Sequence, residues 1–166
     1  IEQLKSSNKN FGILNLLEID ILINGELSVP EGGLKLLDGS IAGIHSGHRQ
    51  DKESITKRMM VAINSPYVQV ISHPTGRLLN QRESYEADWP KVFEGCVKTK
   101  TILEINAYPN RLDLTDTLIR EAKKFGVKFV INTDAHKLEH MDLMRFGIAT
   151  ARRGWATKDD IINTLP

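Results

Sequence analysis

The chain has 166 residues, a length typical of one domain, and 40% of them are apolar, which is enough for a core. Its 22 basic and 21 acidic residues leave a net charge of +1, which argues against a protein that holds nucleic acid by bulk charge, although a local basic patch is not excluded. The single cysteine, Cys96, excludes an internal disulfide framework and a multi-cysteine metal site. No apolar run reaches the ~20 residues that a membrane-spanning helix needs.

The first half of the chain alternates short apolar runs with helix and turn signals. Residues 1–10 are expected to form the end of a helix and a polar loop. Strands are expected at residues 13–22, 40–45 and 67–72, and helices at 30–37 and 51–64. Asp51 is the expected cap of the second helix, whose inward stripe is Ile55, Met59, Ala62 and Ile63. Pro74 is expected to hold the preceding residue, His73, in an extended conformation.

The second half continues the alternation. Strands are expected at residues 101–106 and 128–133, with a last short strand at 148–151. Helices are expected at 89–98, 114–125, 138–146 and 158–165. Pro90 suits the first turn of the helix that carries Cys96, Gly126 ends the next helix, and Thr157 caps the closing one. Leu118, Ala122 and Phe125 are expected on the inner face of helix 114–125.

Polar side chains recur in or just after the predicted strands, at intervals of roughly 30 residues, which is the length of one βαβ unit. They are Glu18, His45, His73, Glu104 with Asn106, and Asp134 with His136. Strand ends converge at one rim of a parallel β/α barrel, and such folds carry their chemistry at that rim. We therefore expect these residues to gather at one end of a parallel sheet.

The types of these residues favour a metal site. Two imidazoles (His45 and His73) and one carboxylate (Glu18) form a catalytic-type set with a position open to water or substrate. Asp134 and His136 are two residues apart, which places them on the same face of a strand. The alternatives are an edge-strand salt bridge for Glu18 and hydrogen-bonded core positions for the two histidines.

Arg77 and Arg111 fall in loops at the same predicted rim. The functional interpretation is that their guanidinium groups bind phosphate. The alternative is ordinary solvated surface charge. His48 and His140 each lie just beyond a better candidate and are expected to be supporting or surface residues. The segment Arg152–Trp155 combines basic and aromatic side chains, which suits nucleic acid, although a surface patch at a helix end is the simpler interpretation.

Taken together, the motifs resemble one known family. They are Glu18-Ile-Asp-Ile-Leu, Ile44-His45-Ser-Gly47, His73-Pro-Thr-Gly-Arg-Leu-Leu79, Glu104-Ile-Asn-Ala, Arg111-Leu-Asp-Leu, Asn132-Thr-Asp134-Ala-His136 and Phe146-Gly-Ile-Ala-Thr-Ala-Arg-Arg-Gly-Trp155. From about Phe11 to the C-terminus the chain resembles the polymerase and histidinol phosphatase (PHP) family, and within it the C-terminal PHP domain of family X DNA polymerases.

The resemblance implies a distorted (β/α)7 barrel with three metal ions, either zinc, manganese or iron. It implies a hydrolase of phosphoester bonds that acts as a 3′-to-5′ exonuclease on DNA ends in repair. In that site Glu18 would bridge two metals, His45 and His73 would join it on one of them, Asp134 would hold another, and His136 would serve the third. Glu18 and Asp134 are thus the expected catalytic residues, and Arg77 and Arg111 the expected substrate-binding residues. A cytoplasmic enzyme is expected from the lack of a membrane-spanning run and of a signal-peptide pattern.

The sequence also departs from the family pattern. The family opens with a His-x-His strand and a second strand ending in histidine, and neither is present. Residues 1–166 are therefore expected to be the C-terminal part of a single PHP domain, with an upstream polymerase domain as partner, and to be a weak or inactive nuclease alone. Two alternatives stay open: a small-molecule phosphatase of the histidinol phosphatase type, and a catalytically degenerate structural PHP module.

Overall fold

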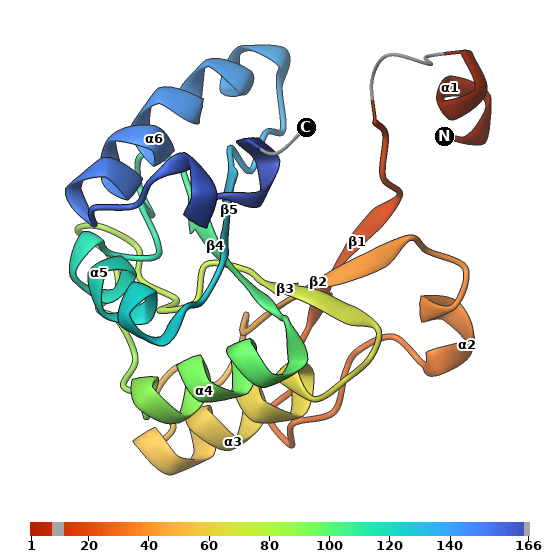
Figure 1. Cartoon of the computed structure of the whole chain (residues 1–166). Helices are drawn as coiled ribbons and strands as arrows, with labels where there is room; N and C mark the ends of the chain where they lie inside the picture. Colours follow the sequence, from red (N-terminus) through yellow and green to blue (C-terminus); the bar gives the residue numbers. More distant parts are fainter. Residues whose placement is uncertain (8–11, 165–166) are drawn as a thin grey trace.

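A sheet of five parallel strands, ordered as in the sequence, is the centre of the fold (Figure 1). This computed structural model describes residues 1–7 and 12–164. The strands are β1 (Leu16–Asp20), β2 (Gly39–Gly43), β3 (Val68–Ile71), β4 (Ile102–Asn106) and β5 (Phe129–Asn132). Each strand pairs with the next one along the chain, and helices alternate with them. The predicted α/β class is confirmed, and the arrangement is consistent with part of a β/α barrel.

The helices follow the predicted order, with shifted ends. The α-helices are α1 (Glu2–Ser7), α2 (Glu31–Leu34), α3 (Lys52–Ile63), α4 (Trp89–Thr99), α5 (Asp116–Phe125) and α6 (Met144–Arg153). Three short 3-10 helices complete the set: η1 (Leu138–Leu143), η2 (Lys158–Asp160) and η3 (Ile162–Thr164). Helices α3 to α6 pack in sequence, each against the next, so that consecutive β/α units lie side by side.

The sequence signals at the helix ends act as expected. The Asp51 carboxylate accepts a hydrogen bond from the Ser54 amide at 2.7 Å and caps α3. Gly126 ends α5 at a φ of +91°, a conformation that glycine adopts without steric cost. The predicted inward stripe of α3, Ile55, Met59, Ala62 and Ile63, is fully buried. Cys96 is also buried, and burial raises the pKa of its thiol to about 12.

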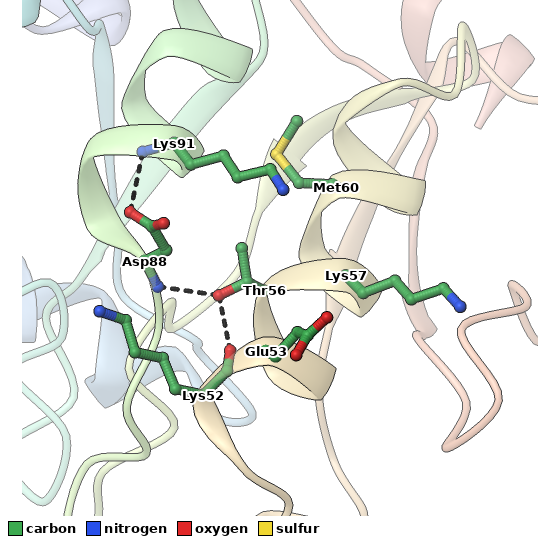
Figure 2. Close-up of a pocket in the computed structure, with 7 residues that line it drawn as sticks. All are labelled: Lys52, Glu53, Thr56, Lys57, Met60, Asp88 and Lys91. Carbon is green, nitrogen blue, oxygen red and sulfur yellow. Dashed lines mark hydrogen bonds between the residues drawn. The ribbon is translucent and has the colours of Figure 1, made fainter.

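Helices α3 and α4 are joined at their N-terminal ends by Thr56 (Figure 2). Its hydroxyl donates to the Lys52 carbonyl at 2.7 Å and accepts from the Asp88 amide at 2.8 Å. The shallow hollow between the helices is lined by Lys52, Glu53, Thr56, Lys57, Met60, Asp88 and Lys91. None of the predicted site residues lines it.

Three predictions about the second half of the chain are wrong, and a fourth is confirmed in part. Residues 148–151 form no strand but lie within α6, because Gly147, Thr150 and Ala151 share a buried helical face. Residues 138–146 are helical as predicted, but 138–143 form the 3-10 helix η1 and the remainder begins α6. Helix 158–165 is replaced by η2 and η3, and Leu165 lies outside the described residues. Phe125 is 39% exposed, and the inner face of α5 is formed by Ile119 and Ala122.

The two ends of the sheet differ in burial. Strand β1 is an edge strand, and its Leu16 and Leu17 are exposed, whereas β4 and β5 are almost wholly buried. Among the described residues, no helix has the length and apolar character to cross a membrane.

Candidate metal centre

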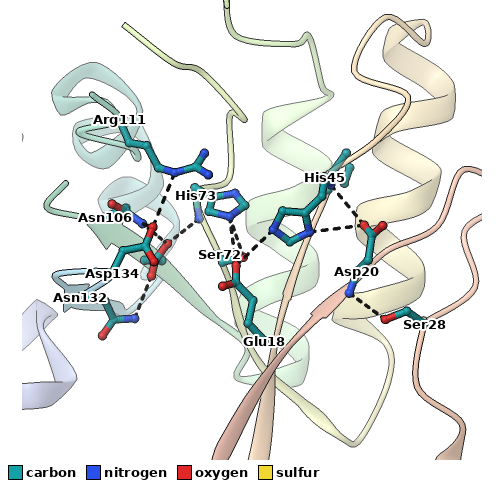
Figure 3. Close-up of polar contacts among 12 residues, drawn as sticks. Glu18, Asp20, Ser28, His45, Ser72, His73, Asn106, Arg111, Asn132 and Asp134 are labelled. Atoms are coloured by element: carbon teal, nitrogen blue, oxygen red, sulfur yellow. Dashed lines mark hydrogen bonds and ion pairs between the residues drawn. The ribbon is translucent and has the colours of Figure 1, made fainter. Parts of the chain in front are cut away.

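Glu18, His45 and His73 come together at the carboxyl end of the first three strands (Figure 3). The Glu18 carboxylate oxygen Oε1 lies 3.0 Å from His73 Nε2 and 3.4 Å from His45 Nε2. One ligand atom from each residue lies within 4.8 Å of the other two. The three side chains therefore converge on one point, although 55 positions separate the first from the last.

Asp20 holds His45 in place. Its carboxylate oxygen Oδ1 accepts the His45 backbone amide at 3.2 Å and lies 3.5 Å from His45 Nδ1. Residues two apart in a strand face the same side, so Glu18 and Asp20 reach His45 together. Sequence reasoning missed Asp20, although its position two residues after Glu18 is a signal that could have identified it.

The ionisation of the cluster follows from these contacts. Hydrogen bonds from His45, His73 and Ser72 hold the pKa of Glu18 far below its usual range, against the opposing effect of burial. The Glu18 carboxylate raises the pKa of His45, with Asp20 as a further cause. Glu18 thus favours a positive charge on the neighbouring His45 imidazole. When that imidazole is neutral, a divalent cation bound beside Glu18 would supply the positive charge instead.

The donor set fits a divalent metal ion. A tetrahedral ion with bonds of about 2.0–2.2 Å spaces its ligand atoms about 3.3–3.6 Å apart. The Glu18–His45 separation of 3.4 Å falls within this range, and the Glu18–His73 separation of 3.0 Å is slightly shorter. Imidazole nitrogen and carboxylate oxygen suit zinc, iron and manganese. In addition, His73 Nδ1 is buried and has no hydrogen-bond partner among the described residues, and a bound water or ion is one explanation for such an atom.

His73 is oriented by a second carboxylate, that of Glu104 on β4. Glu104 is 4% exposed and accepts the His73 amide at 2.6 Å, the Asn132 side chain at 2.9 Å and the Asn106 side chain at 3.3 Å. Burial raises the pKa of Glu104, while the hydrogen bonds from Asn132 and His73 oppose that rise. Sequence reasoning placed Glu104 at the rim but gave it no role.

The backbone of His73 differs from the prediction. Its φ is +27°, so it is not extended, and the expectation drawn from Pro74 is wrong. Positive φ is uncommon for a residue with a side chain and is found where surrounding contacts enforce it. Here the amide is held by Glu104 and the ring by Glu18, which explains the departure.

Asp134 and His136 lie near this cluster but do not join it. A cavity of about 270 Å³ is lined by Glu18, Ile41, Glu104, Asn106, Asn132, Asp134, Ala135 and His136. Asp134 accepts a hydrogen bond from Asn106 at 3.4 Å. The side chain of His136 is 76% exposed, and its Nδ1 lies 2.8 Å from the Asp134 carbonyl. Asp134 has a φ of +52°, so the strand alternation ends before it and the shared-face argument does not apply.

The two predicted phosphate-binding arginines are held differently. Arg77 uses its guanidinium on backbone carbonyls, those of Arg111, at 2.8 Å, and Leu112. Arg111 lies 3.8 Å from the Asp134 carboxylate, and its Nη1 is buried without a hydrogen-bond partner among the described residues. Arg111 therefore lies beside Asp134 at the rim, while Arg77 braces the loop that carries Arg111.

The remaining candidates lie outside the cluster. His48 packs on Tyr85, with ring centroids 6.3 Å apart, and its pKa is lowered by burial and by nearby Arg82 and Arg58. His140 accepts the His136 amide at 3.2 Å. Trp155, at the end of α6, is 65% exposed, with the Arg120 guanidinium 3.9 Å above its ring.

Asp113 was not considered from the sequence. It is fully buried, and its carboxylate accepts the Thr75 amide at 3.0 and 3.1 Å. Burial raises the pKa of Asp113, while its hydrogen bonds with Thr75 oppose that rise. This contact ties the loop after His73 to the loop after β4, which places both loops at the same rim.

Comparison with known proteins identifies relatives. No family model matches the chain. It is 42% identical over 163 residues, 98% of its length, to the DNA polymerase/3′-5′ exonuclease PolX of Bacillus subtilis (strain 168). It is 29% identical over 92% of its length to a probable phosphatase of Thermoanaerobacter sp. (strain X514), and 35% identical over 57% of its length to a probable phosphatase of Citrobacter koseri.

The chain spans 29% of the polymerase, 64% of the Thermoanaerobacter phosphatase and 38% of the Citrobacter phosphatase. The match to the polymerase covers the cluster and all the motifs on which the resemblance rests. The predicted resemblance is therefore confirmed: over nearly its whole length the chain is similar to a part of a family X DNA polymerase/3′-5′ exonuclease, and over more than half of its length to probable phosphatases.

Proposed function

We propose that this chain is part of a metal-dependent phosphoesterase that hydrolyses phosphodiester or phosphomonoester bonds, most specifically as a 3′-to-5′ exonuclease on DNA ends. The observation that carries the proposal is the convergence of Glu18, His45 and His73 at one rim of a parallel sheet. The proposal includes the finer fold expected from the motifs, in which residues 1–166 form the C-terminal part of a distorted (β/α)7 barrel of the PHP type.

The residues present divide the work as follows. Glu18, His45 and His73 would hold a divalent cation, which would supply charge neutralisation of the phosphate and acidification of an attacking water. Glu104 and Asp20 fix the two imidazoles so that their nitrogen atoms face Glu18. Outer contacts of this kind typically change metal affinity by about 10–100-fold.

The cavity beside the cluster would hold the substrate phosphate once metal ions offset its carboxylates, which are Glu18, Glu104 and Asp134. Its lining also carries Asn106 and Asn132, whose amides are oriented by Glu104. Arg111 adds a cation whose Nη1 is not engaged by the described residues. We propose Asp134 and His136 as ligands for further ions at this rim, with Arg111 rather than Arg77 in contact with substrate phosphate.

The test is metal-dependent binding and turnover by the chain. Inorganic phosphate, the product of monoester hydrolysis, should bind the manganese- or zinc-loaded chain in a calorimetric titration. It should not bind the metal-free chain or the His73→Ala variant. Release of p-nitrophenol from p-nitrophenyl phosphate should follow the same order. Equal phosphate binding with and without metal, or by His73→Ala, would contradict the proposal.

The second candidate function is a small-molecule phosphatase, which the similarity to probable phosphatases favours. Assay of labelled single-stranded DNA beside histidinol phosphate, under the same metal conditions, separates the two. Faster turnover of histidinol phosphate would favour the small-molecule reading. A structural module without activity would bind neither metal nor phosphate.

A further inference from the structure

A second cavity opens beside the candidate metal centre, between the loops that follow β2 and β3. It measures about 830 Å³ and is lined by Gly47, His48, Arg49, Leu78, Gln81, Arg82, Glu83 and Ser84. His45 and His73 begin the same two loops. Since consecutive Cα atoms are at most 3.8 Å apart, the Cα atoms of His45 and His48 cannot be more than about 11 Å apart. The cavity is therefore within a few nucleotide steps of the cluster.

The wall of this cavity carries positive charge without matching carboxylates. Arg49 is exposed, and Arg82 is half-buried with its Nε donating to the Gly76 carbonyl at 2.7 Å. Within residues 1–7 and 12–164, neither arginine forms an ion pair. Glu83 is the single acidic residue in the lining, so the arginines outnumber it.

A third arginine reinforces the charge from behind. Arg58 is 2% exposed, and a Cβ added at Gly47 would lie 3.2 Å from its Nη1, so its head group lies directly behind the wall. It donates to the Ser46 carbonyl at 3.0 Å, to the Gln50 side chain at 2.8 Å and to the Ile21 carbonyl. Its Nε has no partner among the described residues. All three acceptors are neutral oxygens, so no hydrogen-bonded carboxylate neutralises Arg58, although the Asp20 carboxylate acts on it electrostatically.

The loops hold this arrangement in a fixed shape. Leu78 and Arg82 exchange backbone hydrogen bonds of 2.9 and 2.8 Å across a tight turn. The Arg82 side chain is tied back to Gly76 on the same loop. The terminal nitrogens of Arg82 are therefore presented by a closed turn rather than by a free chain, which limits the entropy lost on binding.

We propose that this cavity, the Arg49/Arg82 pocket, binds a second phosphate group of a single-stranded polynucleotide, adjacent in the strand to the phosphate held at the metal centre. Guanidinium groups bind phosphate through paired hydrogen bonds, and the volume admits a nucleotide unit with its sugar. A phosphomonoester of a small molecule has no second phosphate to place there. The pocket thus favours polynucleotide over small-molecule substrates, and this part of the inference rests on the proposed phosphoesterase function.

The pocket is tested by binding in the absence of metal. A fluorescein-labelled oligothymidylate is titrated with the chain in EDTA, by anisotropy, across a range of salt concentrations. Arg49→Ala and Arg82→Ala should each weaken binding by about three- to tenfold. Each should also reduce the slope of log affinity against log salt by about 0.7, the value for one phosphate contact on a single strand. Arg49→Lys keeps the charge and should lie between Arg49→Ala and the unaltered chain.

The matched control is Lys124→Ala, which removes one exposed cation from α5; Lys124 itself forms no ion pair with the described residues. It should leave affinity and slope unchanged. Because Arg82 also braces its loop, thermal unfolding is measured for every variant. Arg49 has no side-chain hydrogen bond in the described structure, so Arg49→Ala keeps the test decisive if Arg82→Ala unfolds.

The outcomes separate this inference from the proposed function. Three outcomes would overturn the proposed phosphate pocket. They are equal binding by the unaltered chain and Arg49→Ala, no measurable binding by either, and the same loss of affinity in Lys124→Ala. None of them bears on metal-dependent phosphate release. A loss specific to the two arginines, in a chain that binds no phosphate with any metal, supports the pocket and refutes the phosphoesterase. Competition by thymidine monophosphate as strong as by oligothymidylate would also overturn the requirement for a second phosphate.

Discussion

Glu104 is the residue whose removal should most damage the site from a distance. In Glu104→Ala the buried His73 amide loses its acceptor, which costs about 1–3 kcal/mol. The Asn132 side chain also loses its partner but is only partly buried, so it can turn to water at a cost of about 0.5–1.5 kcal/mol. We therefore expect a loss of about 2–4 kcal/mol in the free energy of unfolding, a large part of the 5–15 kcal/mol typical of a domain.

Glu104→Gln keeps one oxygen to accept the His73 amide, and Asn132 can rotate its own amide to match the new donor. Its cost should be about 1 kcal/mol or less. The assay is urea unfolding followed by circular dichroism, with Glu121→Ala, an exposed glutamate on α5, as the matched control. Zinc affinity, measured by competition with a chelator, should fall by about 10–100-fold in Glu104→Ala because His73 is no longer oriented. A Glu104→Ala variant as stable as Glu121→Ala, with unchanged zinc affinity, would refute the reasoning.

Three further predictions concern other contacts. Asp20→Ala should lower zinc affinity by about tenfold and cost little stability, because His45 is half-exposed. Zinc affinity is measured by chelator competition and stability by thermal unfolding. An unchanged zinc affinity would contradict this prediction. Cys96 should not react with a thiol reagent at pH 8 until the chain is unfolded, since burial raises the pKa of its thiol to about 12. Rapid reaction in the folded state would contradict the burial of Cys96. Burial alone would raise the pKa of Asp160, but hydrogen bonds from Thr157 and the ion pair with Lys123 outweigh burial and lower it. The ionised Asp160 therefore stabilises the fold above its ordinary pKa of 3.8, and this stabilisation is lost as the pH falls through the lowered pKa. Asp160→Asn should flatten the acid limb of the stability profile, and an unchanged limb would argue against it.

The arrangement of the strands could be predicted because each β/α unit repeats the same signals. Apolar runs followed by a polar residue mark the five strands, and the order of those residues places Glu18, His45 and His73 on neighbouring strands. Helix caps such as Asp51 and Gly126 depend only on neighbouring residues, so they could also be predicted from the sequence. The run at residues 148–151 misled because its β-branched residues suggest a strand, whereas its burial follows a helical period set by packing on Ile131.

The supporting contacts of the site could not be predicted in the same way. Glu104 orients His73 across two strands, and Asp113 ties Thr75 across two loops. Both contacts depend on tertiary distances between segments more than 30 positions apart. The left-handed backbone of His73 arises from the same contacts and overrides the local preference set by Pro74. Asp20 is the exception, because its spacing from Glu18 is visible in the sequence.

The central claim is that Glu18, His45 and His73 hold one divalent ion. The most direct measurement is the metal content of the chain after dialysis against zinc or manganese and then against metal-free buffer. It is made for the unaltered chain, His73→Ala and the matched control His140→Ala, whose ring lies outside the cluster. The account predicts one tightly held ion per chain, retained by His140→Ala and lost by His73→Ala. An unaltered chain that retains no ion, one that retains two or more, or a His73→Ala variant that keeps its ion would contradict it.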